Sequence, residues 1–148
     1  MADDTLSAEF LALYTQWGDA IANKQHDWLE DFFAEDFLGT AQPWPTLRVD
    51  KRQMIDLDKA IEAMETKWVK VEAQRIGDEV LTIGHVRYLR EEFREGASIG
   101  ENMPSGSEIA AFTKGKVAVY MNGWRHNGAR WQCYDHHLVA VIDDRGFD

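Results

Sequence analysis

Two long runs of strand-forming residues flank a tight turn in IAAFTKGKVAVYMNGWRHNGARWQCYDHHLVAVID, residues 109–143. The Asn127-Gly128 pair is the strongest hairpin signal in the sequence, because Asn and Gly tolerate the positive φ angles of a tight turn. Ile109 to His126 and Ala129 to Asp143 are therefore predicted as paired antiparallel strands. The two glycines inside the first run are expected to be bends or bulges.

Upstream of this hairpin, the strand pattern continues back to residue 69. Val69 to Ile76 alternates, Gly77-Asp78 makes a tight turn, and Val80 to Phe93 is a long strand rich in β-branched and aromatic residues. Gly96 to Ser107 contains Gly, Ser, Asn and Pro and is predicted as a loop. The C-terminal half therefore indicates a run of antiparallel strands.

The first two-fifths of the chain has helical periodicity instead. A stripe at three- and four-residue spacing predicts one long helix, capped by Thr5 or Ser7, with apolar positions Leu6, Phe10, Leu13, Tyr14, Trp17 and Ile21. Asp27 is expected to cap a short second helix. Asp50 is expected to cap a third helix, whose apolar face comprises Met54, Leu57, Ile61, Met64 and Trp68. Asp36 to Thr40 is predicted as a brief strand, and Gln42 to Pro45 as a rigid loop because proline cannot continue a helix.

Three helices followed by strands indicate an α+β fold. We expect a cone-shaped half-barrel, in which a curved antiparallel sheet is closed by the three N-terminal helices. Such a cone leaves an interior pocket for a small ligand.

Composition limits the class of protein. The chain has 148 residues and a net charge of −10, from 26 Asp plus Glu and 16 Lys plus Arg. This length predicts one domain over residues 1–148. One cysteine argues against a disulfide framework, and the acidic charge argues against nucleic acid or an anionic membrane as a partner. Neither a secretory signal nor a long apolar run is evident, so a cytoplasmic protein is expected.

Three segments are similar to a known superfamily. Phe33-Ala34-Glu35-Asp36 resembles a helix-ending Phe-Ala-x-Asp, Val49 to Ile55 an opening of the third helix, and Asn127 to Trp131 a turn-Gly-x-Trp entry to the last strand. On these residues the chain resembles the nuclear transport factor 2-like superfamily, which includes SnoaL-like polyketide cyclases, ketosteroid isomerases, scytalone dehydratase and limonene-epoxide hydrolase. The resemblance covers nearly the whole chain and implies the cone fold, but no single activity, because the superfamily hosts many chemistries.

The sequence departs from these relatives at several catalytic positions. Trp17 occupies the position that resembles the oxyanion tyrosine of the ketosteroid isomerases, and Thr40-Ala41 falls near their catalytic aspartate. Asn23 falls near the first-helix aspartate of scytalone dehydratase. None of these residues can act as a carboxylate base, so steroid isomerisation by the family's dyad is disfavoured.

The last strand carries the first candidate for proton transfer. Alternation places Tyr134, His136 and Leu138 on one face, and the resemblance implies that this face lines the cone. Histidine has an unperturbed pKa near neutral, so His136 is predicted to carry the proton, although a hydrogen-bonded core histidine is the alternative. His136 and His137 point to opposite faces, and no metal site is expected.

Tyrosines supply the candidates for oxyanion stabilisation. Tyr88 on the Val80 to Phe93 strand, or Tyr134, could donate a hydrogen bond to a developing oxyanion. A tyrosine on a half-exposed strand is the alternative for Tyr88. A bulge in that strand would reverse its phase and bring His85 inward.

The hairpin geometry decides which face of the preceding strand points inward. A two-residue turn places Val119 and Met121 opposite the pocket residues, whereas a three-residue loop with a glycine bulge turns Tyr120, Asn122 and Trp124 inward. We favour the second arrangement, because a pocket needs a few placed polar groups.

Aromatic residues complete the predicted substrate-binding set. Tyr14 and Trp17 lie on the inner stripe of the first helix, and Trp44 in the rigid loop is expected at the rim. The predicted substrate-binding set therefore comprises these three residues together with Tyr120, Asn122 and Trp124 of the hairpin strand. By resemblance, the outer sheet face mediates a homodimer, and it is expected to carry Trp131, Cys133, His137, Leu81 and Ile83.

We therefore hypothesise a cofactor-free acid–base lyase, dehydratase or isomerase. Its substrate is expected to be a hydrophobic, aromatic small molecule of phenolic, lignin-derived or polyketide-like type, as in members of the superfamily that act on diarylpropanes. The alternative is a non-catalytic small-ligand-binding or dimerisation module of the same fold. A metal-independent epoxide hydrolase would need an inward Asp–Arg–Asp set, for which Arg90 and Asp36 are poor candidates.

Overall fold

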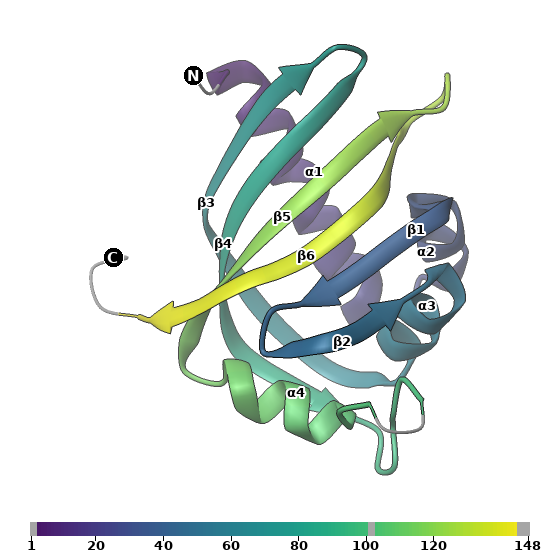
Figure 1. Cartoon of the computed structure of the whole chain (residues 1–148), viewed down its shortest axis with the longest axis vertical. Helices are drawn as coiled ribbons and strands as arrows, with labels where there is room; N and C mark the ends of the chain where they lie inside the picture. The colour runs from purple at the N-terminus through teal and green to yellow at the C-terminus, as the bar shows by residue number, and fades with distance from the viewer. Residues whose placement is uncertain (1–2, 101–102, 145–148) are drawn as a thin grey trace.

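A computed structural model describes residues 3–100 and 103–144. One six-stranded sheet has the order β2-β1-β6-β5-β4-β3, and helices α1, α2 and α3 lie against one of its faces (Figure 1). The helices are α1 (Asp4–Ala22), α2 (His26–Phe32), α3 (Lys51–Lys59) and α4 (Gly106–Thr113). The strands are β1 (Phe33–Ala41), β2 (Trp44–Val49), β3 (Ile61–Ile76), β4 (Glu79–Phe93), β5 (Lys116–His126) and β6 (Trp131–Asp143).

The α+β class is confirmed, but three details of the expected cone are wrong. The sheet is mixed, because β1 pairs with β6 in parallel, and it is not strongly curled. A fourth helix follows β4, so the helices are not all N-terminal. None of the described helices combines the length and apolar character that crossing a membrane requires.

The long first helix forms as its apolar stripe predicts. Its buried side chains are Leu6, Phe10, Tyr14, Trp17, Ala20 and Ile21. The cap is Asp3, whose carboxylate accepts from the Leu6 backbone N–H at 3.0 Å, rather than Thr5 or Ser7. The second helix begins at His26 with Gln25 as its cap residue, not at Asp27.

The third helix is shorter than predicted. It ends at Lys59, and residues 61–76 form β3. The β3–β4 register leaves Glu62 and Val69 without partners, as β-bulges do. Across a bulge, two successive inward side chains are three residues apart in the sequence. Without a bulge, inward side chains are two residues apart, so every second one is four residues away. Ile61, Met64 and Trp68 therefore imitate helical spacing while lying on one face of a strand.

Two further segments differ from the sequence prediction. Residues 109–113 belong to α4, because Ser105 and Glu108 form a capping box that starts a helix there; β5 begins only at Lys116. Trp44 and Pro45 lie in the edge strand β2, where a proline disrupts no second ladder. Residues 101 and 102 of the predicted 96–107 loop lie outside the described residues.

The main core packs aromatic rings between α1, α2 and the sheet. We call this cluster the aromatic core and define it by Phe10, Tyr14, Phe32, Phe33 and Trp124, all fully buried. Phe10 and Trp124 have ring centroids 5.1 Å apart, and Tyr14 and Trp124 meet edge to face at 5.5 Å. A second apolar cluster around Leu47, Val49, Val86 and Leu138 lies toward the β2 edge and α4.

Candidate functional site

A cavity of about 120 Å³ lies between α1, α3, α4 and the inner face of the sheet. Most of its wall is apolar, including Ile21, Leu57, Ile61, Met64 and Leu138. The polar side chains of the wall are Thr40, Asp58, Tyr88, Glu91, Thr113, Tyr120 and His136. An apolar cavity with a few convergent polar groups is the usual form of a small-molecule site.

Asp58 is a carboxyl group buried in the wall of this cavity. Its side chain is only 3% exposed, and Trp17 Nε1 donates to its Oδ2 at 3.3 Å. Burial penalises the charged form and raises the pKa of Asp58 to about 8, despite the opposing effect of the Trp17 hydrogen bond. At neutral pH this carboxyl group is therefore mostly protonated and can donate a proton.

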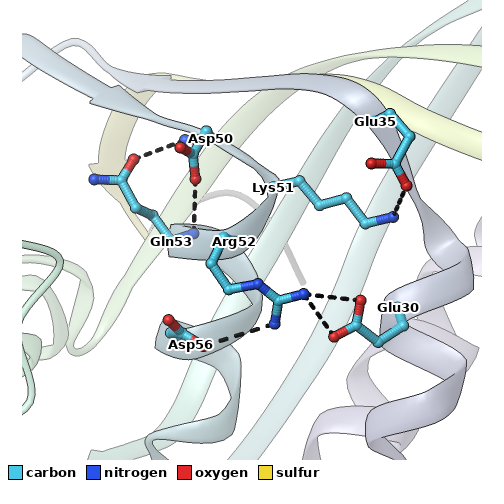
Figure 2. Close-up of polar contacts among 7 residues, drawn as sticks. All are labelled: Glu30, Glu35, Asp50, Lys51, Arg52, Gln53 and Asp56. Carbon is cyan, nitrogen blue, oxygen red and sulfur yellow. Dashed lines mark hydrogen bonds and ion pairs between the residues drawn. The ribbon is translucent and has the colours of Figure 1, made fainter.

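Helix α3, which carries Asp58, is anchored by contacts at its N-terminus (Figure 2). Asp50 and Gln53 form a reciprocal capping box, with the Gln53 backbone N–H 2.8 Å from Asp50 Oδ1. Arg52 reaches both carboxylate oxygens of Glu30 on α2, and Lys51 Nζ lies 2.8 Å from Glu35 on β1. The helix that carries Asp58 is thus tied to α2 and to β1.

Glu91 on β4 contributes a second carboxyl group. Its Oε1 is buried and has no hydrogen-bond partner within the described residues. Burial raises the pKa of Glu91 to about 7, so both the acid and the carboxylate are populated at neutral pH. The two carboxyl groups are close enough for Glu91 to contribute to the raised pKa of Asp58.

A bulge explains why Glu91 faces the cavity. Leu89 has no partner in the β3–β4 register, since Thr66 pairs with Tyr88 and Glu65 with Arg90. The bulge shifts the alternation, so Tyr88 and Glu91 both point inward. Arg90 is instead exposed in an ion pair with Glu92. Asp36 is likewise exposed and paired with Arg125, so the poor candidates for an epoxide-hydrolase set do not meet in the cavity.

Two phenols supply a hydrogen-bond donor to the same cavity. The Tyr88 and Tyr120 hydroxyl oxygens lie 2.9 Å apart. Burial raises the pKa of both phenols above the ordinary value, so both stay neutral. When one hydroxyl donates to the other, the accepting tyrosine keeps its own O–H free to donate to a ligand.

His136 lines the cavity but is held neutral. Burial lowers its pKa to about 3, which argues against an imidazolium proton donor at neutral pH. Its Nδ1 lies 2.8 Å from Asn122 Oδ1, while Asn122 Nδ2 donates to the Tyr14 hydroxyl. Because Asn122 Oδ1 can only accept, His136 carries its proton on Nδ1, and Nε2 keeps a lone pair.

The predicted substrate-binding residues divide into two groups. Trp17, Trp44 and Tyr120 line the cavity, and Trp44 packs on Phe112 of α4 with centroids 5.3 Å apart. Tyr14, Asn122 and Trp124 do not line it. They are fully buried in a network in which Thr82 Oγ1 lies 2.7 Å from the Tyr14 hydroxyl and accepts from Trp124 Nε1 at 2.8 Å. The hairpin loop has four residues, 127–130, rather than two or three.

Tyr134 lies on the other face of the sheet from the cavity. Gly123 pairs with Asp135 and Trp124 with Cys133, so Tyr134 is the extra residue of a β-bulge. Its ring lies over Gly123 and under the Arg125 guanidinium, whose carbon is 4.1 Å from the ring centroid. The bulge restores His136 and Leu138 to the inner face.

The residues expected on the outer, dimer-forming face of the sheet are only partly correct. Cys133 is fully buried among core residues, and Trp131 packs on Phe10 with centroids 5.4 Å apart. Neither residue is on the outer face. Ile83 is exposed there, and Leu81 is partly exposed.

Sequence reasoning missed Asp58 and Glu91. Asp58 had one available signal: it lies three residues after Ile55 and four after Met54, on the buried side of α3. No feature of the sequence pointed to Glu91, apart from the general expectation of a bulge in its strand.

Comparison with solved structures identifies the fold as NTF2-like. An NTF2-like protein from Cytophaga hutchinsonii aligns with a TM-score of 0.66 and 16% identity, over 90% of this chain and 97% of that chain. A candidate dehydratase of the NTF2-like family from Streptomyces avermitilis aligns with a TM-score of 0.61 and 15% identity, over 90% and 94%. LinA aligns with a TM-score of 0.63 and 15% identity, over 97% and 93%.

At these identities the likeness establishes the fold alone. No protein-family model matches the sequence, and no curated protein matches it significantly. Two other neighbours are themselves described as proteins of unknown function. An activity must therefore be argued from the cavity.

Proposed function

We propose that the protein is a cofactor-free acid–base enzyme, a lyase, dehydratase or isomerase, that acts on a hydrophobic cyclic small molecule. The observation that carries the proposal is a pair of carboxyl groups in the wall of one apolar cavity, the buried Asp58 and the partly buried Glu91. Their raised pKa values lie near the working pH, where general acids and bases are most effective. The likeness to a candidate dehydratase is consistent with this chemistry.

The two carboxyl groups suit different roles. In the proposed reaction, ionised Glu91 removes a proton from the carbon beside a carbonyl group, and the C–H electron pair moves toward the carbonyl oxygen. Protonated Asp58 and the free phenol O–H of the Tyr88–Tyr120 pair donate to that oxygen. Returning the proton from Glu91 to another carbon completes an isomerisation.

The same groups can perform a dehydration. This reaction requires a hydroxyl on the carbon β to the carbonyl group, next to the carbon that Glu91 deprotonates. Asp58 gives its proton to that hydroxyl, the C–O bond breaks, and water leaves as the C=C bond forms. His136 is assigned a different role from the proton shuttle predicted from sequence. With its neutral Nδ1–H tautomer, it is proposed to accept a hydrogen bond from the substrate through Nε2.

The test is turnover of a panel of cyclic β-hydroxyketones and enones, followed by the ultraviolet absorbance of the conjugated system. We expect Glu91→Gln to lower the rate about 100- to 10,000-fold, the range for a general base. Glu62→Gln changes an exposed glutamate on β3 and should leave the rate unchanged. An undiminished rate in Glu91→Gln with folding verified would remove the carboxyl pair from the mechanism.

A non-catalytic ligand-binding module is the second candidate. The low pKa of His136 favours this alternative. Histidine ordinarily titrates near pH 7 and is well suited to proton transfer there, but His136 is held neutral. Under this alternative, a bound ring compound is recovered chemically unchanged from the wild-type protein. Under the leading proposal, prolonged incubation converts it.

We also propose a homodimer through the outer sheet face. Leu38, Ile83 and Val139 are 38%, 39% and 37% exposed on β1, β4 and β6, which supports an apolar contact there. Sedimentation should show a concentration-dependent dimer that Ile83→Lys converts to monomer. Ile76→Lys, at the exposed end of β3, should not affect it. A monomeric wild-type protein at high concentration would refute this assembly.

A further inference from the structure

The size of the cavity restricts what can occupy it. Its volume of about 120 Å³ is slightly below that of an engineered apolar cavity of about 150 Å³ that stays dry and binds benzene. Two linked or fused rings need roughly twice the space of one. Phenolic dimers, steroids and fused polyketide aromatics exceed this volume, so the cavity favours a single ring over these larger members of the expected substrate classes.

The charges of the wall restrict the ligand further. None of the described residues that line the cavity is Lys or Arg, whereas two are carboxylic acids. A buried carboxylate or phosphate ligand would lose its hydration without gaining a counter-charge, which is costly in an apolar site. Anionic ligands are therefore excluded by the wall itself.

The hydrogen-bonding groups favour an oxygen substituent over an ammonium group. The Tyr88–Tyr120 pair leaves one phenol O–H that needs an acceptor. Glu91 Oε1 is a buried acceptor that lacks a donor within the described residues. A ligand oxygen can accept from the phenol, and a ligand hydroxyl can also donate to Glu91. An ammonium group can only donate, so it would leave the phenol unpaired.

We infer that the ligand is one uncharged six-membered ring with an oxygen substituent, such as a cyclic enone or a phenol. This inference rests on the proposed function and names the substrate class of the same site. Trp17 and the aliphatic side chains of α1, α3 and β3 enclose the ring. The Tyr88–Tyr120 pair donates to its oxygen, and where that oxygen is a hydroxyl it also donates to Glu91.

Calorimetric binding of five probes tests the inference. Phenol and cyclohex-2-enone should bind, whereas 2-naphthol, benzoate and benzylammonium should each bind at least about tenfold more weakly than phenol. Binding of 2-naphthol, benzoate or benzylammonium as tightly as phenol overturns the size, charge or hydrogen-bonding argument respectively. Absence of binding by both phenol and cyclohex-2-enone at their solubility limits overturns the inference as a whole.

An enlarged cavity supplies a gain of binding that misfolding cannot produce. Met54 lines the cavity, so Met54→Ala should increase the affinity for 2-naphthol at least about tenfold. Met121 is partly buried in β5 but does not line the cavity, so Met121→Ala should preserve the wild-type order of affinities. Unchanged naphthol affinity in a folded Met54→Ala variant contradicts the size argument.

The binding series and the turnover panel can fail separately. If phenol and the enone bind selectively but no cyclic substrate is converted, the ligand class holds and the proposed activity falls. If a two-ring substrate is turned over through Glu91, the activity holds and the ligand class falls.

Discussion

In the aromatic core, the Tyr14 hydroxyl accepts from Asn122, lies 2.7 Å from Thr82 Oγ1, and belongs to a network that also satisfies the indole N–H of Trp124. At the cavity, Asp58 has one hydrogen bond from Trp17, and Glu91 Oε1 has none within the described residues. The two regions share α1 and the inner sheet face, and both bury polar groups among aromatic rings.

The difference indicates what each region is for. A buried polar group costs stability unless it is paired, so a region selected for stability alone pairs its polar atoms. The aromatic core does so. Polar groups left unpaired beside an empty volume are ready to bind or react with a ligand. We therefore expect substitutions in the aromatic core to alter stability, and substitutions at the cavity to alter binding, turnover and pH dependence.

The largest expected stability effect comes from Trp124→Ala in the aromatic core. This change removes a fully buried indole that packs against Phe10 and Phe32 and donates to Thr82. Unfolding in urea should show a loss of about 3–5 kcal/mol. The comparison residue is Trp44, whose ring lines the cavity, and Trp44→Ala should cost much less stability than Trp124→Ala. Equal losses would show that the two regions do not differ.

Asp58→Asn should stabilise the protein in alkaline solution. The pKa of Asp58 is about 8 in the folded state and near its ordinary value of 3.8 when unfolded. Between these values the native state binds a proton that the unfolded state lacks, so stability falls as pH rises. Asparagine can keep the bond from Trp17 without ionising. The variant should exceed wild type by more than about 1 kcal/mol at pH 8 and match it near pH 4.

The stability comparison of wild type with Asp58→Asn is most informative between pH 7 and 8, because His136 also changes stability in acid. Its folded pKa of about 3 lies below the ordinary 6.5, so its contribution to stability is present above pH 6.5 and is lost as pH falls toward 3. The carboxyl groups and His136 therefore oppose each other in acid. Between pH 7 and 8 the Asp58 contribution should dominate. A wild-type stability that rises between pH 7 and 8 relative to Asp58→Asn would contradict the raised pKa.

Two tyrosine substitutions compare the regions at the level of one hydroxyl. Tyr14→Phe leaves Thr82 and Asn122 short of a buried partner and should cost about 1–3 kcal/mol. Tyr88→Phe removes only the bond to Tyr120 and should cost about 1 kcal/mol or less, while weakening the binding of phenol. Thermal unfolding and calorimetry on both variants measure the two effects. Weakened phenol binding in Tyr14→Phe alone would reverse the assignment of the regions.

The smallest expected effect is at the anchor of α3. Arg52 is exposed and Glu30 is partly exposed, and ion pairs at the surface contribute between zero and about 1 kcal/mol. Arg52→Ala should change the free energy of unfolding within that range and leave phenol affinity within about twofold. A larger loss of affinity would show that the ion pair positions Asp58, beyond what the capping box alone provides.

Much of the fold could be predicted from local patterns. The stripe of α1, the length of β4 and the turn after Asn127 depend on neighbouring residues, and they are seen in the structure. Residues 61–68 could not be assigned correctly, because bulges set by pairing with β4 give a strand the spacing of a helix. The parallel pairing of β1 with β6 joins segments about a hundred residues apart, which no local pattern encodes.

The candidate site was predicted only in part, for a related reason. Trp17 was predicted from an apolar stripe, Tyr88 and His136 from strand alternation and the family resemblance, Tyr120 from the hairpin, and Trp44 from a rigid loop. All five line the cavity. Tyr134 was misplaced by the bulge at its own position. Asp58 and Glu91 are ordinary acidic residues in an acidic sequence. Only burial distinguishes them from the other 24.

The most direct test of the central claim is a ¹³C NMR titration of the Asp58 and Glu91 side-chain carboxyls, assigned through Asp58→Asn and Glu91→Gln. It should be run with and without saturating phenol. We predict midpoints near pH 8 and pH 7 in the free protein, both displaced when phenol occupies the cavity. Midpoints near the ordinary carboxyl values, unmoved by phenol, would contradict the account of a buried acid pair at a ligand site.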